Sequence, residues 1–500
     1  MAATRLVETH LSLLLMSDER VLKWKKPVAF EFVDLRTLEA RQRICRREVE
    51  LNRRLAPDVY EGVAELRGPG GELWEPVVVM RRLPEERRLA TLVGGDDPSV
   101  TDGLGKLAQL MAAFHSGADR SAAIAAQGRA AAVTARWEAN LRQLRDSGVR
   151  LGPVPTADLD AVERLATAWL AGRGPLLDSR AEAGYVVDGH GDLQADDVFL
   201  LEQGPAVIDC LEFDDDLRAV DVADDIAFLA MDLEHLGRAD LASAFVDAYD
   251  TASARRGLDP LPRHLVDVWA AYRAVVRAMV TCLRAAQSDP ATPEHTAAVA
   301  DVALLLAIAR RRLEAAEVRV VLVGGSPGTG KSKLARGLAA AHSWPVVRSD
   351  EIREEVVVAV GPDRRYEPAE VDRVYAAVLE RARPLLARGE TVVLDATWGS
   401  AARRARARDL AAASGARVIE VRCVVDAETA ASRVAARAAR GTDVSEATPD
   451  VARRLAAEFD PWAEAIEVDT SGPATTTLGA ALTALGQVGR APVDVGRPLA

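Results

Sequence analysis

Hydrophobic and polar residues alternate along the start of the chain in a way that predicts a small sheet. A helical period covers residues 38–55. Residues 1–100 are therefore expected to form a sheet with one helix. Four segments have the pattern of strands, in two pairs that are each joined by a polar or Gly-rich turn: residues 11–16, 21–32, 59–66 and 73–82.

The next part of the chain is rich in alanine and has a helical period. Helices are expected over residues 104–170 and 222–316, and the second range has breaks near 257–262 and 289–293. Residues 101–315 are therefore predicted to be a mostly helical lobe.

From residue 318 the pattern changes to short apolar strands that alternate with helices. Such alternation is typical of a parallel sheet covered by helices. We expect this second domain over residues 318–485, after a boundary near 313–317. Residues 486–500, in which Gly and Pro recur, are expected to form a mobile tail. The strands are expected at residues 318–323, 345–348, 391–395 and 417–424.

The composition is that of a soluble multidomain protein, since 49% of the 500 residues are hydrophobic and 28% are charged. The net charge of −12 argues against general binding to nucleic acids or anionic membranes, so small molecules are the expected partners. The four cysteines have neither disulfide-framework nor zinc-site spacing, which favours a reducing cytoplasm. The apolar runs are too short to predict a membrane span, and the oligomeric state stays open.

A glycine-rich turn, GSPGTGKS, lies between the strand at 318–323 and the helix that follows. This pattern is typical of a phosphate-binding loop, because its glycines let backbone N–H groups and the helix N-terminus face a nucleoside triphosphate. Lys331 can reach the β and γ phosphates, and Ser332 can ligate Mg²⁺. The residues expected to bind the nucleotide are Gly325, Ser326, Pro327, Gly328, Thr329, Gly330, Lys331, Ser332 and Lys333.

Two acidic residues near the middle of the chain suit phosphoryl transfer. Asp192 lies on a turn in the segment DGHGDLQADD, and Asp209 ends the short apolar run AVID. One such acid can accept or orient a substrate hydroxyl, and the other can hold Mg²⁺ on the phosphates.

With these motifs, residues 1–315 resemble the aminoglycoside phosphotransferase and choline kinase superfamily. Its fold is that of the protein kinases, and its signature is HGDLxxxN followed by a strand that ends in an IDF-like triplet. The resemblance implies a two-lobed domain in which Asp192 is the catalytic base, Asp209 is a Mg²⁺ ligand and His190 fixes the loop. Asp197 stands where the superfamily commonly has an Asn that binds a second metal. An Asp still offers oxygen to Mg²⁺, but its charge opposes nearby phosphates unless the metal neutralises it.

The same resemblance identifies a lysine, its partner and a hinge. Lys23 occupies the place of the superfamily's phosphate-contacting lysine, and Glu48 on the next helix would be its ion-pair partner. Lys25 shares the strand face of Lys23, because side chains alternate with a period of two, and it remains an alternative. Another interpretation is a solvated basic edge strand. Met80 would lie at the hinge between the lobes, beside the nucleotide.

Eight acidic residues lie between Asp209 and Asp225, against a single base, Arg218. Next to the acceptor, such charge would favour an amine-bearing substrate, such as an amino sugar or amino alcohol, with Glu212 and Asp214 as its ligands. The alternative is a mixture of metal ligands, acids at a helix N-terminus and a solvated loop.

In the second domain, the segment SDEIR follows the strand at 345–348, and a further acid ends the strand at 391–395. With its phosphate-binding loop, this domain resembles the P-loop small-molecule and polynucleotide kinases, including zeta-toxin-like and gluconate-kinase-like members. The resemblance implies that Asp350 activates the acceptor hydroxyl, that Arg353 binds substrate or phosphate, and that Asp395 lies near Mg²⁺.

Arg433 and Arg437 stand four residues apart on a predicted helix and share a face. They could close over the transferring phosphates as lid arginines. The alternative is that they are solvated members of an Arg-rich region.

Together these features predict a multidomain protein of mixed α+β and α/β class, in which a protein-kinase-like two-lobed domain precedes a P-loop kinase domain. We expect two sites for ATP and Mg²⁺, at least one of which transfers phosphate to a small-molecule hydroxyl. In one alternative, one of the two domains binds nucleotide as a regulator and has no turnover. The N-terminal domain is the better candidate for this role. In another, the P-loop domain phosphorylates nucleic-acid 5′ ends or nucleotide sugars.

Overall fold

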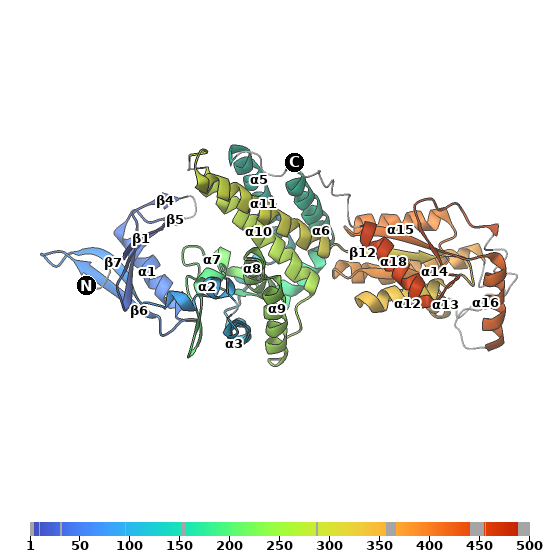
Figure 1. Cartoon of the computed structure of the whole chain (residues 1–500), viewed down its shortest axis with the longest axis horizontal. Coiled ribbons are helices and arrows are strands. Elements are labelled where there is room, and N and C mark those ends of the chain that lie inside the picture. Colours follow the sequence, from blue (N-terminus) through green and yellow to red (C-terminus); the bar gives the residue numbers. More distant parts are fainter. Residues whose placement is uncertain are drawn as a thin grey trace. The chain divides into compact units, whose positions relative to one another are not determined.

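The computed structural model describes residues 5–9, 11–30, 33–95, 97–151, 156–286, 289–356, 367–440, 455 and 457–488. The chain divides into two compact units (Figure 1). The first comprises Met1–Arg164 and Leu177–Ala316, and the second comprises Leu165–Leu176 and Glu317–Ala500.

The first unit begins with an antiparallel sheet that carries one helix, as predicted. Helix α1 (Leu38–Asn52) starts at Thr37, whose side chain accepts the Ala40 N–H, and its buried Cys45 and Val49 pack against the sheet. The strands, in spatial order, are β1 (Arg5–Glu8), β2 (Ser12–Met16), β3 (Arg20–Lys25), β7 (Leu73–Arg81) and β6 (Tyr60–Arg67).

The prediction of one strand over residues 21–32 is wrong. β3 ends at Lys25, and Ala29–Phe30 (β4) pairs with Val33–Asp34 (β5) as a separate small hairpin. Pro27 explains the break, because proline has no N–H to donate to a neighbouring strand. Strand β1 was not predicted.

The rest of the first unit is mostly helical, as predicted. Helix α8 (Val222–His235) is buried almost along its whole length and lies against α9, α10 and α11. The expected breaks fall between α9 and α10 and between α10 and α11. The other helices are α2 (Leu89–Val93), α3 (Ser99–Gly117), α4 (Ala122–Gln127), α5 (Ala130–Leu151), α6 (Thr156–Glu182), α9 (Ala239–Ala254), α10 (Arg263–Ala285) and α11 (Pro293–Ala315).

Short strands interrupt these helices where the acidic motifs lie. β9 pairs with β10 as a hairpin, and β8 pairs antiparallel with β11, which lies farther along the chain. The short elements of the first unit are η1 (Glu85–Arg87), β8 (Val186–Asp188), η2 (Ala195–Asp197), β9 (Val198–Leu201), β10 (Gly204–Val207), α7 (Asp215–Arg218) and β11 (Ala219–Asp221).

The second unit contains the predicted parallel sheet. Val320 and Leu322 of its central strand pack with α14 and α15, whereas Val321 and Val323 pack with α12 and α18, so both faces of the strand are covered. In spatial order the strands are β13 (Val346–Arg348), β14 (Val392–Asp395), β12 (Arg319–Gly324), β15 (Arg417–Val424) and β16 (Ile466–Asp469). The helices are α12 (Lys331–His342), α13 (Ser349–Val356), α14 (Pro368–Ala387), α15 (Ala401–Ala413), α16 (Ala427–Arg440) and α18 (Ala474–Val488).

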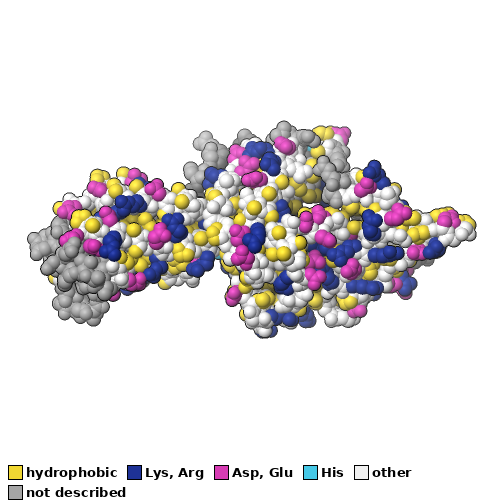
Figure 2. Space-filling view, turned by 180° about the vertical axis from the view of Figure 1, so that it is seen from behind, with side chains coloured by type: hydrophobic (Ala, Val, Ile, Leu, Met, Phe, Trp, Pro, Cys, Tyr) yellow, Lys and Arg dark blue, Asp and Glu magenta, His cyan; other side chains and the backbone are white. Residues whose placement is uncertain are grey.

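The last helix extends into the segment that was predicted to be a tail. Helix α18 continues to Val488, past the predicted start of the tail at residue 486, and residues 489–500 lie outside the described residues. In the described part of the chain, the helices are too short or too polar to cross a membrane. On the face drawn in Figure 2, basic and acidic side chains are interspersed over both units.

Candidate active sites

A short hairpin brings two of the predicted metal ligands together in the first unit. β9 and β10 pair with Val198 opposite Val207, so the residues before and after them meet at the open end of the hairpin. Asp197 precedes β9, and its carbonyl accepts the Ile208 N–H at 2.9 Å. Asp209 follows directly. The two carboxyl groups predicted to face the metal therefore come from one local structure.

The backbone of Asp209 adopts a conformation that side-chain-bearing residues seldom use. Its φ is 64°, in the left-handed region, which Asp tolerates better than most residues. Neighbouring groups hold this geometry: the Asp209 N–H lies 3.3 Å from the Tyr60 hydroxyl, and the Cys210 N–H donates to Asn52 Oδ1 at 2.9 Å. Such over-determined backbone is a feature of functional sites.

Lys23 and Lys25 lie on one face of β3, as the period of two predicts, and both reach Glu48. Lys23 Nζ lies 2.8 Å from Glu48 Oε1 and 2.7 Å from Asp209 Oδ1. Lys25 Nζ lies 2.7 Å from Glu48 Oε2 and 2.5 Å from Glu212 Oε1. Of the two lysines, it is Lys23 that contacts Asp209; the role of either lysine toward a phosphate stays a prediction.

Burial and pKa shifts agree with a tightly paired network. Lys23 is 9% exposed and Lys25 is 2% exposed, on a strand with neighbours on both sides, so the interpretation as a solvated edge strand is wrong. Burial alone would raise the pKa of Glu48, but the two lysines lower it below its ordinary value. The charge of Lys23 is the main reason why the pKa of Asp209 is lowered to about 2, since burial alone would raise it.

A buried carboxylate that the sequence did not single out holds the turn that carries Asp192. Asp225 of α8 accepts the N–H of His190 at 2.7 Å and that of Gly191 at 2.8 Å. His115 Nε2 lies 3.2 Å from the same carboxylate. Burial would raise the pKa of Asp225, but the His115 contact and these hydrogen bonds lower it. Asp225 therefore stays ionised and fixes the turn.

Asp192 is placed to exchange a proton near neutral pH. Gln194 Nε2 donates to its Oδ1 at 2.8 Å, and the Asp192 N–H lies 3.3 Å from His190 Nδ1. Burial raises the pKa of Asp192 to about 6, although the charge of Arg273 opposes the shift. A carboxyl group with such a pKa suits a general base.

Asp197 differs from Asp209 in its electrostatic surroundings. Burial first, and then the charges of Asp209 and Asp192, raise its pKa well above the ordinary value. A cation close to these carboxyl groups would reverse that effect. Within the described ranges, no group of three or more His, Cys, Asp or Glu side chains is arranged to hold an ion without other ligands.

The remaining predicted residues of the first unit have partners inside the chain. Met80 is buried in β7 within the core cluster that also contains Phe199 and Ala206 of the β9–β10 hairpin. The Asp214 side chain caps α7 by accepting the Asp216 N–H at 2.9 Å, whereas the Glu212 carboxylate is taken by Lys25. Their roles as substrate ligands stay predictions.

Most of the acids between residues 209 and 225 are likewise engaged. Asp221 receives two hydrogen bonds at 2.7 Å from Arg180 and caps α8, and Asp224 is paired with Arg273. Asp215 is paired with Arg218. Helix caps, as in the alternative interpretation, and ion pairs, which neither interpretation included, thus account for much of this charge; the amine-bearing substrate stays a prediction.

The glycine-rich loop of the second unit has the backbone of a phosphate cradle. Gly325, Gly328 and Gly330 have φ values of 140°, 89° and 84°, and Gly330 precedes the first turn of α12. A Cβ at Gly328 would lie 2.3 Å from the Ala430 carbonyl oxygen, so only glycine fits there. The Thr329 hydroxyl donates to the Ser326 carbonyl at 2.8 Å and tightens the loop.

Side chains with free polar atoms surround this cradle. Within the described residues, neither Lys331 nor Ser332, at the start of α12, has a side-chain hydrogen bond or ion pair. Asp395 ends β14 beside Val323 of β12; its Oδ2 accepts from Arg348 at 3.2 Å, and its buried Oδ1 has no hydrogen-bond partner there. A buried, unpartnered carboxylate oxygen suits a metal or an ordered metal ligand.

Asp350 and Arg353 lie at the same edge of the sheet. β13 ends at Arg348, opposite Asp395, and α13 follows at once, so Asp350 lies in its first turn. Arg353 donates to Asp350 Oδ1 at 2.8 Å. In open parallel sheets the carboxyl ends of the strands are where ligands bind.

The structure describes one of the two predicted lid arginines. Arg433 donates to the Thr470 carbonyl at 2.8 Å and lies beside Gly330 of the loop. The side chain of Arg437 lies outside the described residues. Sequence reasoning missed Thr470, whose hydroxyl donates to the Thr329 carbonyl at 2.6 Å and anchors the loop. It follows β16, a strand that the pattern did not predict.

Comparison with known proteins adds to this geometry. Residues 32–261 match the model of a phosphotransferase enzyme family, and residues 320–462 match the model of an AAA domain. The uncharacterized protein Rv2004c of Mycobacterium tuberculosis is 42% identical over 482 residues, which are 95% of this chain and 94% of that protein. Protein Mb2027c of Mycobacterium bovis matches to the same extent.

Solved structures show more distant similarity. A gluconokinase from Sinorhizobium meliloti is 20% identical, over 35% of this chain and 93% of that one, with a TM-score of 0.27. A choline/ethanolamine kinase family protein from Mesorhizobium loti is 14% identical, over 62% of this chain and 92% of that one, with a TM-score of 0.35. The two family matches identify the chain as a kinase-type phosphotransferase with a P-loop nucleotide-binding domain.

Proposed function

Because the chain belongs to the same family as the mycobacterial proteins Rv2004c and Mb2027c, and carries two kinase-type domains, we propose that it has two ATP sites. At least one of them transfers the γ-phosphate of ATP to a hydroxyl of a small molecule, such as an amino sugar, a sugar or an amino alcohol. The acceptor oxygen forms a bond to phosphorus, the bond to the β–γ bridging oxygen breaks, and ADP leaves.

The phosphate-binding loop supports this proposal most strongly. Its three left-handed glycines, the unpaired Lys331 at the start of α12 and the orphaned Oδ1 of Asp395 converge on one edge of the sheet within the described residues. Lys331 would stabilise negative charge on the transferring group, and Asp350 would orient the acceptor hydroxyl.

In the first unit, the residues divide the same work differently. Lys23, held by Glu48, would contact the phosphates, and Asp192 would take the proton of the acceptor hydroxyl on a carboxylate oxygen. The carboxylate and hydroxyl oxygens of the two proposed sites also suit Mg²⁺. This ion prefers oxygen ligands and usually keeps substrate phosphates among them. Bound Mg²⁺ would neutralise phosphate charge. Asp209 and Asp197 would hold the ion of the first unit. Ser332 and Asp395 would hold the ion of the second unit.

Separate inactivation of the two sites tests the proposal. Lys331→Ala should lower the rate of phosphate transfer at the second-unit site by about 100-fold or more, and the isosteric Asp192→Asn should do the same at the first-unit site. Losses of this size are usual when a key electrostatic group is removed. Arg336→Ala, a change at an exposed position of α12, is the matched control and should keep its rate. Acceptors to screen with radiolabelled ATP are amino sugars, sugar acids, amino alcohols and oligonucleotides. Turnover that survives in the double variant would contradict the assignment.

A second candidate function concerns the first unit alone. When it is ionised, Asp197 would oppose bound phosphates, so this unit could bind nucleotide as a regulator without turnover. Asp197→Asn distinguishes the two functions. A gain of phosphate transfer in that variant, with none in the unmodified chain, would favour the regulator.

We place this kinase in the cytoplasm as part of the same proposal. All four cysteines are buried and none forms a disulfide, which suits a reducing compartment. Fractionation of producing cells tests the assignment.

A further inference from the structure

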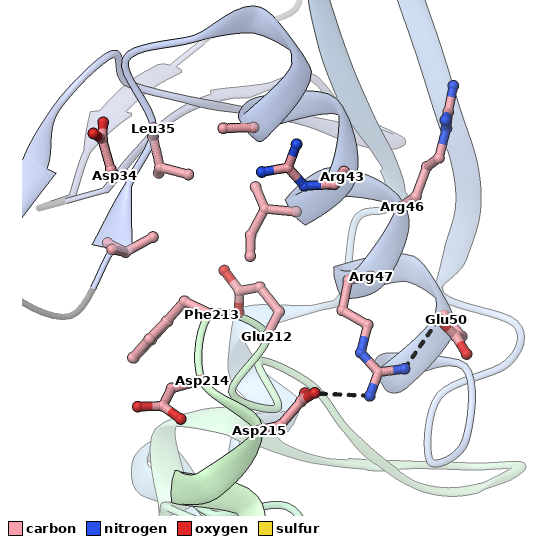
Figure 3. Close-up of a pocket in the computed structure, with 13 residues that line it drawn as sticks. Asp34, Leu35, Arg43, Arg46, Arg47, Glu50, Glu212, Phe213, Asp214 and Asp215 are labelled. Carbon is pink, nitrogen blue, oxygen red and sulfur yellow. Dashed lines mark hydrogen bonds and ion pairs between the residues drawn. The ribbon is translucent and has the colours of Figure 1, made fainter.

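A pocket of about 760 Å³ lies in the first unit between α1, the β5 region and the segment 212–215 (Figure 3). This volume is within the range of small-molecule sites, roughly 300–1,000 Å³. Its lining, as far as the described residues go, includes neither Lys23 nor Asp192, Asp197 or Asp209. The pocket is therefore distinct from the nucleotide site proposed for this unit.

One face of α1 forms a wall of the pocket. Ala40, Arg43, Ile44 and Arg47 recur at the spacing of neighbouring helical turns and all line it. The face of the helix that carries Cys45 and Val49 packs against the sheet, and Glu48 follows one turn after Ile44. Apolar side chains of Val33, Leu35 and Phe213 complete the lining.

Three of the carboxylates on the other walls already have a cationic partner. The Glu212 carboxylate lies 2.5 Å from Lys25 Nζ, and Asp34 lies 2.6 Å from Arg36. Asp215 is paired with Arg218 and lies 3.4 Å from Arg47.

Arg43 differs from these groups. Within the described part of the chain, its guanidinium makes no hydrogen bond or ion pair. Figure 3 shows the Arg43 side chain on the pocket side of α1, and Arg46 of the same helix also lines the pocket. The pocket thus combines apolar side chains with two arginines, Arg43 and Arg46, that have no counter-charge within the described residues.

We propose that this pocket binds a small molecule with a carboxylate or phosphate group and an apolar body, and that its occupancy controls the nucleotide site of the first unit. The anionic group pairs with Arg43, and the apolar body lies over Leu35, Ile44 and Phe213. Guanidinium groups suit this recognition, because they donate two parallel hydrogen bonds to one carboxylate or phosphate.

Two contacts connect the pocket with the nucleotide site. Glu48, on the helix that forms the pocket wall, holds both Lys23 and Lys25. Glu212, which lines the pocket, holds Lys25 from the other side. A molecule that bridges α1 and the segment 212–215 would fix both partners of this network. It should therefore tighten nucleotide binding, and by linkage nucleotide should tighten its own binding by the same factor.

Calorimetry with phenyl phosphate, an anion with an aromatic body, tests the site. The experiment uses the full chain with the substitution Lys331→Ala, so that the probe does not bind at the phosphate loop. Arg43→Gln should weaken probe binding about tenfold, which is the usual value of one charge-assisted hydrogen-bonded pair. Arg142→Gln, at an exposed position of α5 outside the pocket lining, is the matched control and should leave it unchanged. Absence of binding to the parent chain, or equal loss in both variants, would overturn the proposal.

Nucleotide affinity provides the second readout. Saturation with phenyl phosphate should tighten ADP·Mg²⁺ binding to the first unit by about fivefold, the lower end of usual allosteric couplings, and Arg43→Gln should abolish this shift. An unchanged affinity in the parent chain would refute the control of the nucleotide site. Neither measurement needs an acceptor or turnover, so failure of the proposed reaction would leave this test intact.

Discussion

Asp192 and Asp209 are chemically identical carboxyl groups whose neighbours set different protonation. The charge of Lys23 lowers the pKa of Asp209 to about 2, whereas burial raises the pKa of Asp192 to about 6. One group is therefore ionised at any physiological pH and can face a cation, and the other can accept a proton from a hydroxyl. Backbone geometry at Asp209 and the hydrogen bonds of Asp225 keep them in these surroundings.

This difference predicts a pH profile for the first unit. In the Lys331→Ala chain, kcat/KM should fall below pH 6, about tenfold per pH unit, because Asp192 must be ionised to act as a base. Steady-state rates between pH 4.5 and about 8 measure it. The residual rate of Asp192→Asn should lack this limb. If the limb survives in that variant, it belongs to the nucleotide and the role of Asp192 is wrong.

Gly328 offers a second prediction for a single residue. Gly328→Ala should weaken nucleotide binding to the second unit about tenfold or more, because its φ of 89° and the Ala430 carbonyl, 2.3 Å from the new Cβ, force the loop to shift. Equilibrium binding of a fluorescent ATP analogue to the Asp192→Asn chain measures it. Gly479→Ala in α18, where a Cβ meets nothing within 4 Å, should bind normally. Equal affinity in the two variants would contradict this account of the cradle.

At the scale of elements, α1 and β3 are joined by buried charge. Lys25→Met should destabilise the first unit by about 3 kcal/mol, because it leaves Glu212 buried without its partner. Lys25→Met combined with Glu212→Gln should recover part of the loss, since the second change removes the uncompensated charge. Hydrogen exchange of the β3 amides, compared among the three chains, locates and measures the effect. Additive losses in the double variant would show that the pair is not coupled.

The elements that could be predicted from the sequence are those with a strong local pattern. β12 and β14 of the second unit are almost entirely apolar, and glycine and lysine mark the loop between β12 and α12, so the sequence predicts these strands and the loop at their observed places. β1 and β16 are four-residue strands that are stabilised by pairing with distant segments, and their own pattern is too short to predict them. The strand predicted over residues 21–32 ends early because Pro27 has no N–H to donate to a neighbouring strand.

The candidate sites show the same limit. Motif spacing predicted the loop residues and the pair Asp192 and Asp209. It could not show which of Lys23 and Lys25 meets Asp209, because that depends on how the sheet docks on the β9–β10 hairpin. Counting acids between residues 209 and 225 predicted strong negative charge, but the partners that compensate it come from α1, α6 and α10. Pairing, and not composition, decides the field in such a region.

For the whole molecule, each unit has its own buried core. Cys45, Val78 and Met80 belong to a cluster of the first unit, whereas Val320 and Val321 belong to clusters of the second. Each of the two proposed phosphate sites is formed by residues of one unit. The two transfer rates should be separable by single substitutions.

The overall charge leads to a last prediction, about nucleic acids. The chain carries 75 acidic residues against 63 basic ones, and the face in Figure 2 shows the two kinds interspersed. Affinity for nucleic acid depends on clustered cations that displace counterions from phosphates. A labelled single-stranded oligonucleotide should therefore bind more weakly than about 100 μM at physiological salt, the weak end of non-specific binding. Fluorescence anisotropy at two salt concentrations measures it. Tighter binding with a steep salt dependence would instead support the phosphorylation of nucleic-acid ends by the P-loop unit.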